Sequence, residues 1–244
     1  MDDLERRVLA AIDHDALLDY LRELISIPSP TGQEAEAQRS VARRMADVGL
    51  DVDTWDLDLD SLRAHPDFSM EVERQDGLGV VGVVGGERDG RSLLLNGHVD
   101  VVAPADESVW RYPPWEATID SGRVYGCGAV DMKGGLCCAL FAARAIRDAG
   151  VTLDGNLIVA SVVGEEDGGV GTLATILRGY TADGAVIMEP TRLEIAPSQA
   201  GALSFRITIP GRSAHACVRE EGVSAIDKFL PIHAALAKLE RERN

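Results

Sequence analysis

The sequence is poor in lysine, cysteine and aromatic residues, and it has no long apolar run. Acidic residues outnumber basic residues by 40 to 24, which leaves a formal net charge of −16. A surface this acidic repels phosphate groups, so the composition argues against binding to nucleic acid or to an anionic membrane. No stretch of about 18 apolar residues occurs, which argues against a membrane-spanning helix.

The cysteines are too few and too irregularly spaced for a disulfide framework. The four cysteines are Cys127, Cys137, Cys138 and Cys217, and no pair has the spacing of a zinc finger or a redox motif. We expect Cys137 and Cys138 to be small buried residues of one helix. Reduced thiols and a first segment without a basic or an apolar signal region predict a cytoplasmic protein.

The first part of the chain alternates between predicted helices and strands. Residues 4 to 26 have the periodicity of one amphipathic helix. Thr31-Gly32-Gln33-Glu34 matches a capping box and predicts a helix to about Val48. Residues 51 to 59 alternate like a strand. Residues 77 to 82 match the glycine pattern of a dinucleotide-binding turn, but no helix follows, so we expect a strand and a hairpin.

Three apolar runs each end at a candidate metal ligand. The runs are 93–96, 157–163 and 185–188, and they lead into His98, into Glu165 and Glu166, and into Glu189. Their length is typical of strands that are buried on both faces. In an open α/β sheet, reactive groups gather beyond the carboxyl ends of such strands. One histidine with several carboxylates suits a zinc-type or cobalt-type site better than a phosphate site.

Each candidate also has a simpler explanation. Asp131 lies in a glycine-rich turn before a predicted helix, where an aspartate is most often an N-cap. Asp100 lies two residues after His98, so on an extended segment its carboxylate could accept the second ring N–H of that histidine. The alternative is a histidine in a turn with an unrelated aspartate nearby. Glu165 and Glu166 would point to opposite sides at a strand end, but an acidic, solvated turn remains an alternative.

Four ordered motifs carry a family resemblance. They are His98-Val99-Asp100, the block Gly-Cys-Gly-Ala-Val-Asp-Met-Lys-Gly-Gly at 126–135, Glu165-Glu166, and Glu189-Pro190-Thr191. Over most of residues 15 to 240 the chain resembles the M20 metallopeptidases, in particular the acetylornithine deacetylases and succinyl-diaminopimelate desuccinylases. Cys127 is a departure, because relatives usually carry arginine there, and this weakens the assignment to a subfamily.

The resemblance implies a fold and a role for each candidate. The fold is an α/β catalytic domain over residues 1–191, with a mixed sheet flanked by helices, followed over 192–244 by the start of an inserted α+β lid or dimerisation domain. The resemblance implies that His98 and Glu189 bind a first metal ion, that Glu166 binds a second, and that Asp131 bridges the two. It also implies that Glu165 is the general base and that Asp100 orients His98. His215 would stabilise the oxyanion. The resemblance also implies a cis peptide after Asp131.

The implied activity is metal-dependent hydrolysis of the amide bond of a small N-acyl amino acid by a metal-bound water. Zn²⁺ or Co²⁺ would be the cofactor, with two ions in a complete site, and the protein could form a homodimer through its lid. An aminopeptidase or carboxypeptidase of the same family is one alternative. An inactive, truncated module that binds metal or dimerises is another. The sequence has no Gly-x-Ser-x-Gly elbow, which argues against a serine hydrolase.

The resemblance also implies that part of the second metal site is absent. Relatives are longer and supply a last histidine to the second ion after the lid. The histidines of this chain are His14, His65, His98, His215 and His233, and none lies in a block that matches that ligand. We therefore expect one well-formed site from His98, Asp131 and Glu189, a weak second site, and some uncovered apolar surface.

The charge imbalance predicts a dependence on salt. Only Lys133, Lys228 and Lys238 are lysines among the 24 basic residues, a composition that resembles salt-adapted surfaces. Raising the KCl concentration from millimolar to molar should screen the repulsion between carboxylates and raise the thermal unfolding midpoint and the activity. Circular dichroism melts across the salt series measure the first effect. A midpoint that stays constant or falls with salt would contradict the hypothesis.

Overall fold

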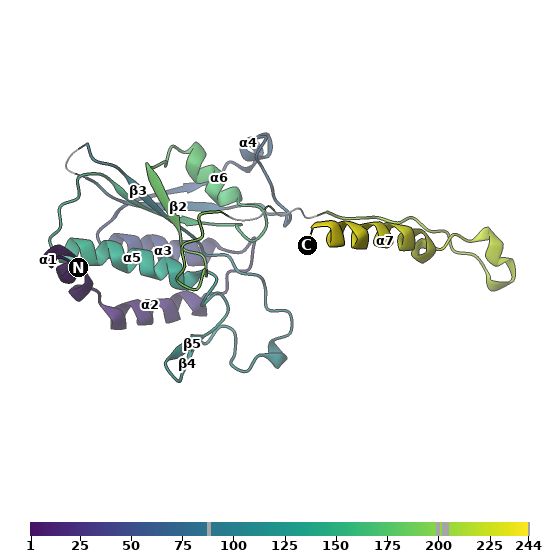
Figure 1. Cartoon of the computed structure of the whole chain (residues 1–244), viewed down its shortest axis with the longest axis horizontal. Coiled ribbons are helices and arrows are strands. Elements are labelled where there is room, and N and C mark those ends of the chain that lie inside the picture. Colours follow the sequence, from purple (N-terminus) through teal and green to yellow (C-terminus); the bar gives the residue numbers. More distant parts are fainter. Residues whose placement is uncertain (87–88, 199–200, 202–204, 244) are drawn as a thin grey trace. The chain divides into compact units, whose positions relative to one another are not determined.

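Five of the described strands pair into one mixed sheet, and their order decides which strand ends lie together (Figure 1). In pairing order the sheet contains β1 (Asp51–Asp56), β2 (Leu78–Val84), β6 (Leu157–Val162), β3 (Leu93–His98) and β7 (Gly184–Ile187). The β1–β2 and β2–β6 pairs are antiparallel, whereas β3 is parallel to both β6 and β7. The predicted α/β class with a mixed sheet is therefore confirmed.

The protein is described by a computed structural model for residues 1–86, 89–198, 201 and 205–243. The chain divides into two units, Met1–Glu194 and Ile195–Asn244. The sheet and its helices belong to the first unit. The division lies close to the expected domain boundary after residue 191, and the catalytic and lid roles given to the two domains remain predictions.

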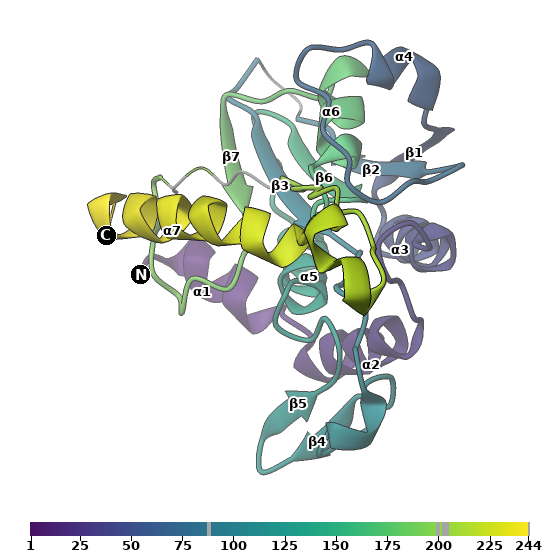
Figure 2. The ribbon, with the colours of Figure 1, turned by 90° about the vertical axis from the view of Figure 1, so that its right-hand side faces the viewer.

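Helices cover both faces of the sheet. The first unit contains α1 (Asp3–Ala10), α2 (His14–Ser26), α3 (Ala35–Asp47), α4 (Leu59–Arg63), α5 (Lys133–Asp148) and α6 (Val170–Leu177), with a 3-10 turn at Glu107–Val109 and a small hairpin of β4 (Thr118–Asp120) and β5 (Arg123–Tyr125). In Figures 1 and 2, α3 and α5 lie on one side of the sheet and α6 lies on the other. No helix among the described residues is long and apolar enough to span a membrane.

Burial follows the position of each strand in the sheet. β6 is buried along its whole length, with Val159 in the main core and Ile158 and Ala160 in a smaller cluster. All four residues of β7 are exposed. The expectation of burial on both faces is thus confirmed for β6 and wrong for β7, because β7 is an edge strand that, among the described elements, packs substantially against β3 alone.

The single helix expected over residues 4 to 26 is two helices, α1 and α2. Asp13 separates them, because its carboxylate accepts a hydrogen bond from the Ala16 N–H at 3.0 Å and so caps the start of α2. The capping box expected at Thr31–Glu34 is also wrong. Glu34 is the N-cap residue of α3, and no side-chain hydrogen bond caps that helix.

Helix α5 is fixed at its first residue by a buried lysine. The Lys133 ammonium donates hydrogen bonds of 2.9 Å to the carbonyls of Leu24 and Ile27, at the end of α2. Burial lowers the pKa of Lys133 to about 8. Further along α5, Cys137 is buried as expected, but Cys138 is exposed. Successive residues of a helix point in different directions, so only one of this pair can face the core.

Among its described residues, the second unit has little regular structure before its last helix. It contains a 3-10 segment, η2 (Ala216–Glu221), and α7 (Ala225–Arg243), and none of the residues of α7 is buried. The alternation of polar and apolar residues over 201–209 predicts a strand, but none forms at residue 201 or at 205–209, and residues 202–204 lie outside the described residues.

A glycine sets the distance between α5 and the end of β7. A Cβ atom at Gly135 would overlap the carbonyl oxygen of Met188, whereas one at Gly85 would meet no atom within 4 Å. Gly135→Ala should therefore destabilise the fold by about 1–3 kcal/mol through overpacking, less a gain in helix propensity of about 1 kcal/mol. Urea unfolding measures the loss. Gly85→Ala is the matched control and should leave stability nearly unchanged, so equal effects would contradict the packing argument.

Candidate metal centre

The parallel strands bring the candidate ligands to one edge of the sheet. His98 is the last residue of β3 and pairs in register with Val162 of β6, while Asn96 pairs with Ile187 of β7. Glu165 and Glu166 follow β6 within a few residues, and Glu189 follows β7. Because these three strands run in the same direction, their carboxyl ends meet at the same edge.

His98 lies at the centre of the cluster. Its side chain is 1% exposed, and Nε2 lies 3.1 Å from Asp131 Oδ1, 3.6 Å from Glu189 Oε1 and 3.8 Å from Glu165 Oε2. Among the described residues, two sets of ligand atoms each lie within 4.8 Å of one another: His98 with Glu165 and Glu189, and His98 with Asp131 and Glu166. All the residues predicted to bind metal are therefore close together.

The backbone fixes the orientation of the His98 ring. Nδ1 lies 2.9 Å from the carbonyl oxygen of Asp100. A carbonyl oxygen can only accept, so Nδ1 carries a proton and Nε2 faces the carboxylates. The sequence predicted that the Asp100 carboxylate would accept this bond, but its Oδ1 lies 3.7 Å from Nδ1. Asp100 thus orients His98 through its backbone.

The Asp100 carboxylate instead holds the turn that carries two glutamates. Its oxygens accept hydrogen bonds from the N–H groups of Glu165 and Glu166, at 3.2 and 3.1 Å. These two residues lie in a turn after β6, so the expected strand-like alternation of their side chains is wrong. The buried carboxylate takes this role because backbone N–H groups need acceptors.

Asp131 is free of the capping role that its position suggested. The N-cap of α5 is Met132, and no side-chain hydrogen bond caps the helix. The Asp131–Met132 peptide is cis, as the resemblance implied. The Asp131 carboxylate is 52% exposed and lies on the Nε2 side of His98, so it is available to an ion.

The charges of the cluster are unbalanced. Burial raises the pKa of Glu189 to about 7, with further contributions from Asp131 and Glu165 that outweigh the opposing effect of His98. Burial and the nearby Asp131 also raise the pKa of Glu166. Burial lowers the pKa of His98, but the surrounding carboxylates reverse this effect and raise it overall. The site therefore favours a positive charge between Nε2 and the carboxylates.

The residues present fit a divalent ion. Ligand atoms of a tetrahedral zinc site are about 3.3 Å apart, given bonds of about 2.0 Å. The distances from Nε2 to Asp131 and Glu189 are near this value. One imidazole nitrogen with carboxylate oxygens is a donor set typical of zinc, cobalt or manganese.

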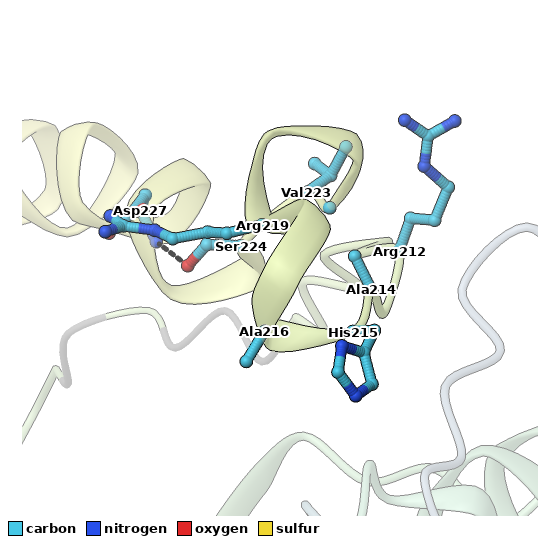
Figure 3. A pocket seen from close by; sticks show the side chains of 9 residues that line it. Arg212, Ala214, His215, Ala216, Arg219, Val223, Ser224 and Asp227 are labelled. Carbon is cyan, nitrogen blue, oxygen red and sulfur yellow. Dashed lines mark hydrogen bonds between the residues drawn. The ribbon is translucent and has the colours of Figure 1, made fainter.

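His215 lies in the second unit. It precedes η2, and its Nδ1 accepts a hydrogen bond from the Cys217 N–H at 3.1 Å. The ring lines a pocket of about 400 Å³ together with Arg212, Arg219 and Asp227 (Figure 3). Its predicted role at the oxyanion remains a prediction.

Sequence reasoning missed a buried ion pair behind the cluster. The Arg74 guanidinium lies 2.8 Å from the Glu34 carboxylate, and both side chains are almost fully buried. Arg74 lies outside every motif and every apolar run, in a stretch rich in charged residues. No local signal distinguishes it from a solvated surface arginine.

Comparisons with known proteins agree with these observations. The model of peptidase family M20/M25/M40 matches residues 94–235. N-formyl-4-amino-5-aminomethyl-2-methylpyrimidine deformylase from Halalkalibacterium halodurans is 35% identical over 96% of this chain and 55% of its own length. Succinyl-diaminopimelate desuccinylase from Methylorubrum extorquens is 31% identical over 92% of this chain and 57% of its own length. The chain thus spans about half the length of these curated relatives.

Solved structures share the fold. Human carnosine dipeptidase 1 superimposes with a TM-score of 0.60 at 24% identity, over 77% of this chain and 41% of the dipeptidase. A tripeptidase from Staphylococcus aureus gives a TM-score of 0.59 at 24% identity, over 88% of this chain and 54% of the tripeptidase. The family match, the ordered motifs and the shared fold together confirm the predicted resemblance: this chain belongs to peptidase family M20/M25/M40.

Proposed function

We propose that the chain carries most of the active site of a metal-dependent hydrolase that cleaves the amide bond of a small N-acyl compound. The observation that carries the proposal is the position of His98 Nε2, which faces Asp131, Glu189 and Glu165 within 3.8 Å at the carboxyl edge of the parallel strands. The deformylase and the desuccinylase among its relatives support this reaction class, since each name describes the removal of an acyl group.

In this proposal, His98, Asp131 and Glu189 hold a first divalent ion, and Asp131 and Glu166 approach a second. Zn²⁺ or Co²⁺ suits the donor set. A bound ion supplies Lewis-acid chemistry, because it polarises the scissile carbonyl and acidifies the attacking water. The hydrogen bond from Nδ1 to Asp100 supports the role of His98 by keeping Nε2 directed at the carboxylates.

Glu165 is the proposed general base. Its side chain is 46% exposed and lies 3.8 Å from His98 Nε2, so it borders the cluster and also reaches water. It accepts a proton as the water oxygen forms its bond to the carbonyl carbon, and it donates that proton to the nitrogen as the carbon–nitrogen bond breaks. The Asp100 carboxylate fixes the backbone of Glu165 during both steps.

A deacylase is favoured over a peptidase. The deformylase is 35% identical to this chain over 96% of the chain and 55% of the deformylase. The peptidase structures are 24% identical or less, and they share the fold.

We propose His215 as a candidate oxyanion donor and the second unit as a lid or dimerisation domain, on the basis of the family resemblance. A panel of N-formyl, N-acetyl and N-succinyl amines, assayed beside dipeptides with Co²⁺ or Zn²⁺, tests the reaction class, and turnover of dipeptides alone would contradict it.

Replacing Glu165 should separate metal binding from catalysis. Glu165→Ala should lower turnover by roughly a hundredfold to ten-thousandfold, because it removes the base, and should leave the metal content unchanged. Turnover assays and elemental analysis of the dialysed protein measure the two effects. Glu166→Ala is the comparison and should lower the metal content. A loss of metal from Glu165→Ala would instead make Glu165 a ligand, as its position beside His98 and Glu189 allows.

Metal ions should stabilise the fold through His98. At a free Co²⁺ concentration about 100-fold above Kd, the free energy of unfolding should rise by about 2.7 kcal/mol. Urea unfolding with and without Co²⁺ measures this gain. His98→Ala should abolish it because the central nitrogen ligand is lost, while His215→Ala should preserve it. An equal gain in wild type and His98→Ala would refute the proposed site.

A further inference from the structure

The turn that carries Glu165 and Glu166 is attached to the fold on two sides. The Asp100 carboxylate binds its first two N–H groups. The next residue, Asp167, is 4% exposed. Its Oδ2 accepts a hydrogen bond from the Val72 N–H at 3.0 Å, and its carbonyl accepts one from the Glu71 N–H at 3.1 Å. A distant loop therefore holds the far end of the turn.

Arg74, from the same loop, lies against the turn. Its side chain is fully buried, and Nη2 lies 2.8 Å from Glu34 Oε1 and 4.0 Å from Asp167 Oδ1. A Cβ atom at Gly164, the residue before Glu165, would lie only 2.6 Å from this same Nη2. The guanidinium thus packs directly beneath the backbone where the turn begins.

This arrangement is costly for stability alone. Burying a guanidinium and two carboxylates carries a large desolvation penalty, and good pairing is needed to offset it. Yet Nε and Nη1 of Arg74 and Oδ1 of Asp167 have no protein hydrogen-bond partner, and they are three of the four such buried side-chain atoms among the described residues. Well-packed apolar residues would fill this space at lower cost. Since stability does not require these buried and partly unpaired polar side chains, we look for another role for Arg74 and Asp167.

We propose that Arg74 is a positioning residue, which acts through Asp167 to hold the Glu165–Glu166 turn where Glu166 reaches the metal cluster and Glu165 borders it. The inference rests on the proposed metal-dependent function. Asp100 restrains the turn at the N–H groups of Glu165 and Glu166, and the Arg74–Asp167 pair restrains it at the flanking residues Gly164 and Asp167. With either restraint removed, Glu166 would keep its chemistry and lose its position.

Co²⁺ binding to the full chain tests the inference. The visible absorption of Co²⁺ reports affinity and coordination without any substrate, and urea unfolding reports stability. Asp167→Ala should weaken Co²⁺ binding by about tenfold or more and alter the spectrum at saturation. Asp167→Asn keeps an acceptor for the Val72 N–H and should recover most of the affinity. Arg74→Met alone would leave the Glu34 carboxylate buried without its partner. The double variant Arg74→Met with Glu34→Gln is therefore used to preserve folding. This double variant should bind Co²⁺ about tenfold more weakly than the wild type.

A buried polar residue away from the turn is the matched control. Gln38 is fully buried and donates hydrogen bonds to the carbonyls of Leu78 and Ser161, in β2 and β6. Gln38→Leu should lower stability and leave Co²⁺ affinity unchanged.

The outcomes separate the inference from the function on which it rests. Wild-type affinity and spectrum in either Asp167→Ala or the double variant would overturn the positioning role. Equal weakening in Gln38→Leu would also overturn it, because the effect would then follow general destabilisation. A wild-type chain that binds no Co²⁺ would sink the proposed function, and the inference with it.

Discussion

The chemistry of the cluster depends on one hydrogen bond, from His98 Nδ1 to the carbonyl of Asp100. This bond fixes which ring nitrogen carries the proton and aims Nε2 at a group of carboxylates. The same residue, Asp100, uses its buried carboxylate to hold the turn that carries Glu165 and Glu166. One short segment at the end of β3 therefore sets the position of the imidazole and of two acidic side chains.

A compensating positive charge would stabilise the acidic cluster. Carboxylates crowd around one imidazole, and burial raises the pKa values of Glu166 and Glu189. Placing such groups together costs free energy unless a cation or a proton lies among them. A divalent ion would meet this requirement, and in the proposed function it would also supply the chemistry of amide hydrolysis. The electrostatic cost of the cluster and its proposed activity thus have the same physical origin.

Much of the architecture could be predicted from local patterns. The apolar runs at β3, β6 and β7 indicated parallel strands, and the ordered motifs indicated which residues meet beyond their ends. Two predictions failed because local signals compete, whereas the expected burial of β7 and of Cys138 failed because position in the fold decides burial. Asp13 divides an apparently continuous helix because its carboxylate caps a new one, and Glu34 is drawn from its expected capping role into an ion pair with Arg74.

By itself, the sequence determined the family, the fold class and the identities of the candidate ligands, because these depend on residue type and spacing along the chain. Only the tertiary structure decided that the Asp100 backbone binds the His98 ring, that β7 is exposed, and that Arg74 lies beneath the Glu165–Glu166 turn. The exposure of β7 and the position of Arg74 depend on segments far apart in the sequence, whereas the His98 ring chooses between two acceptors of one nearby residue. A side chain's partner depends on which buried donors and acceptors the folded chain places nearby, and no spacing along the sequence encodes that choice.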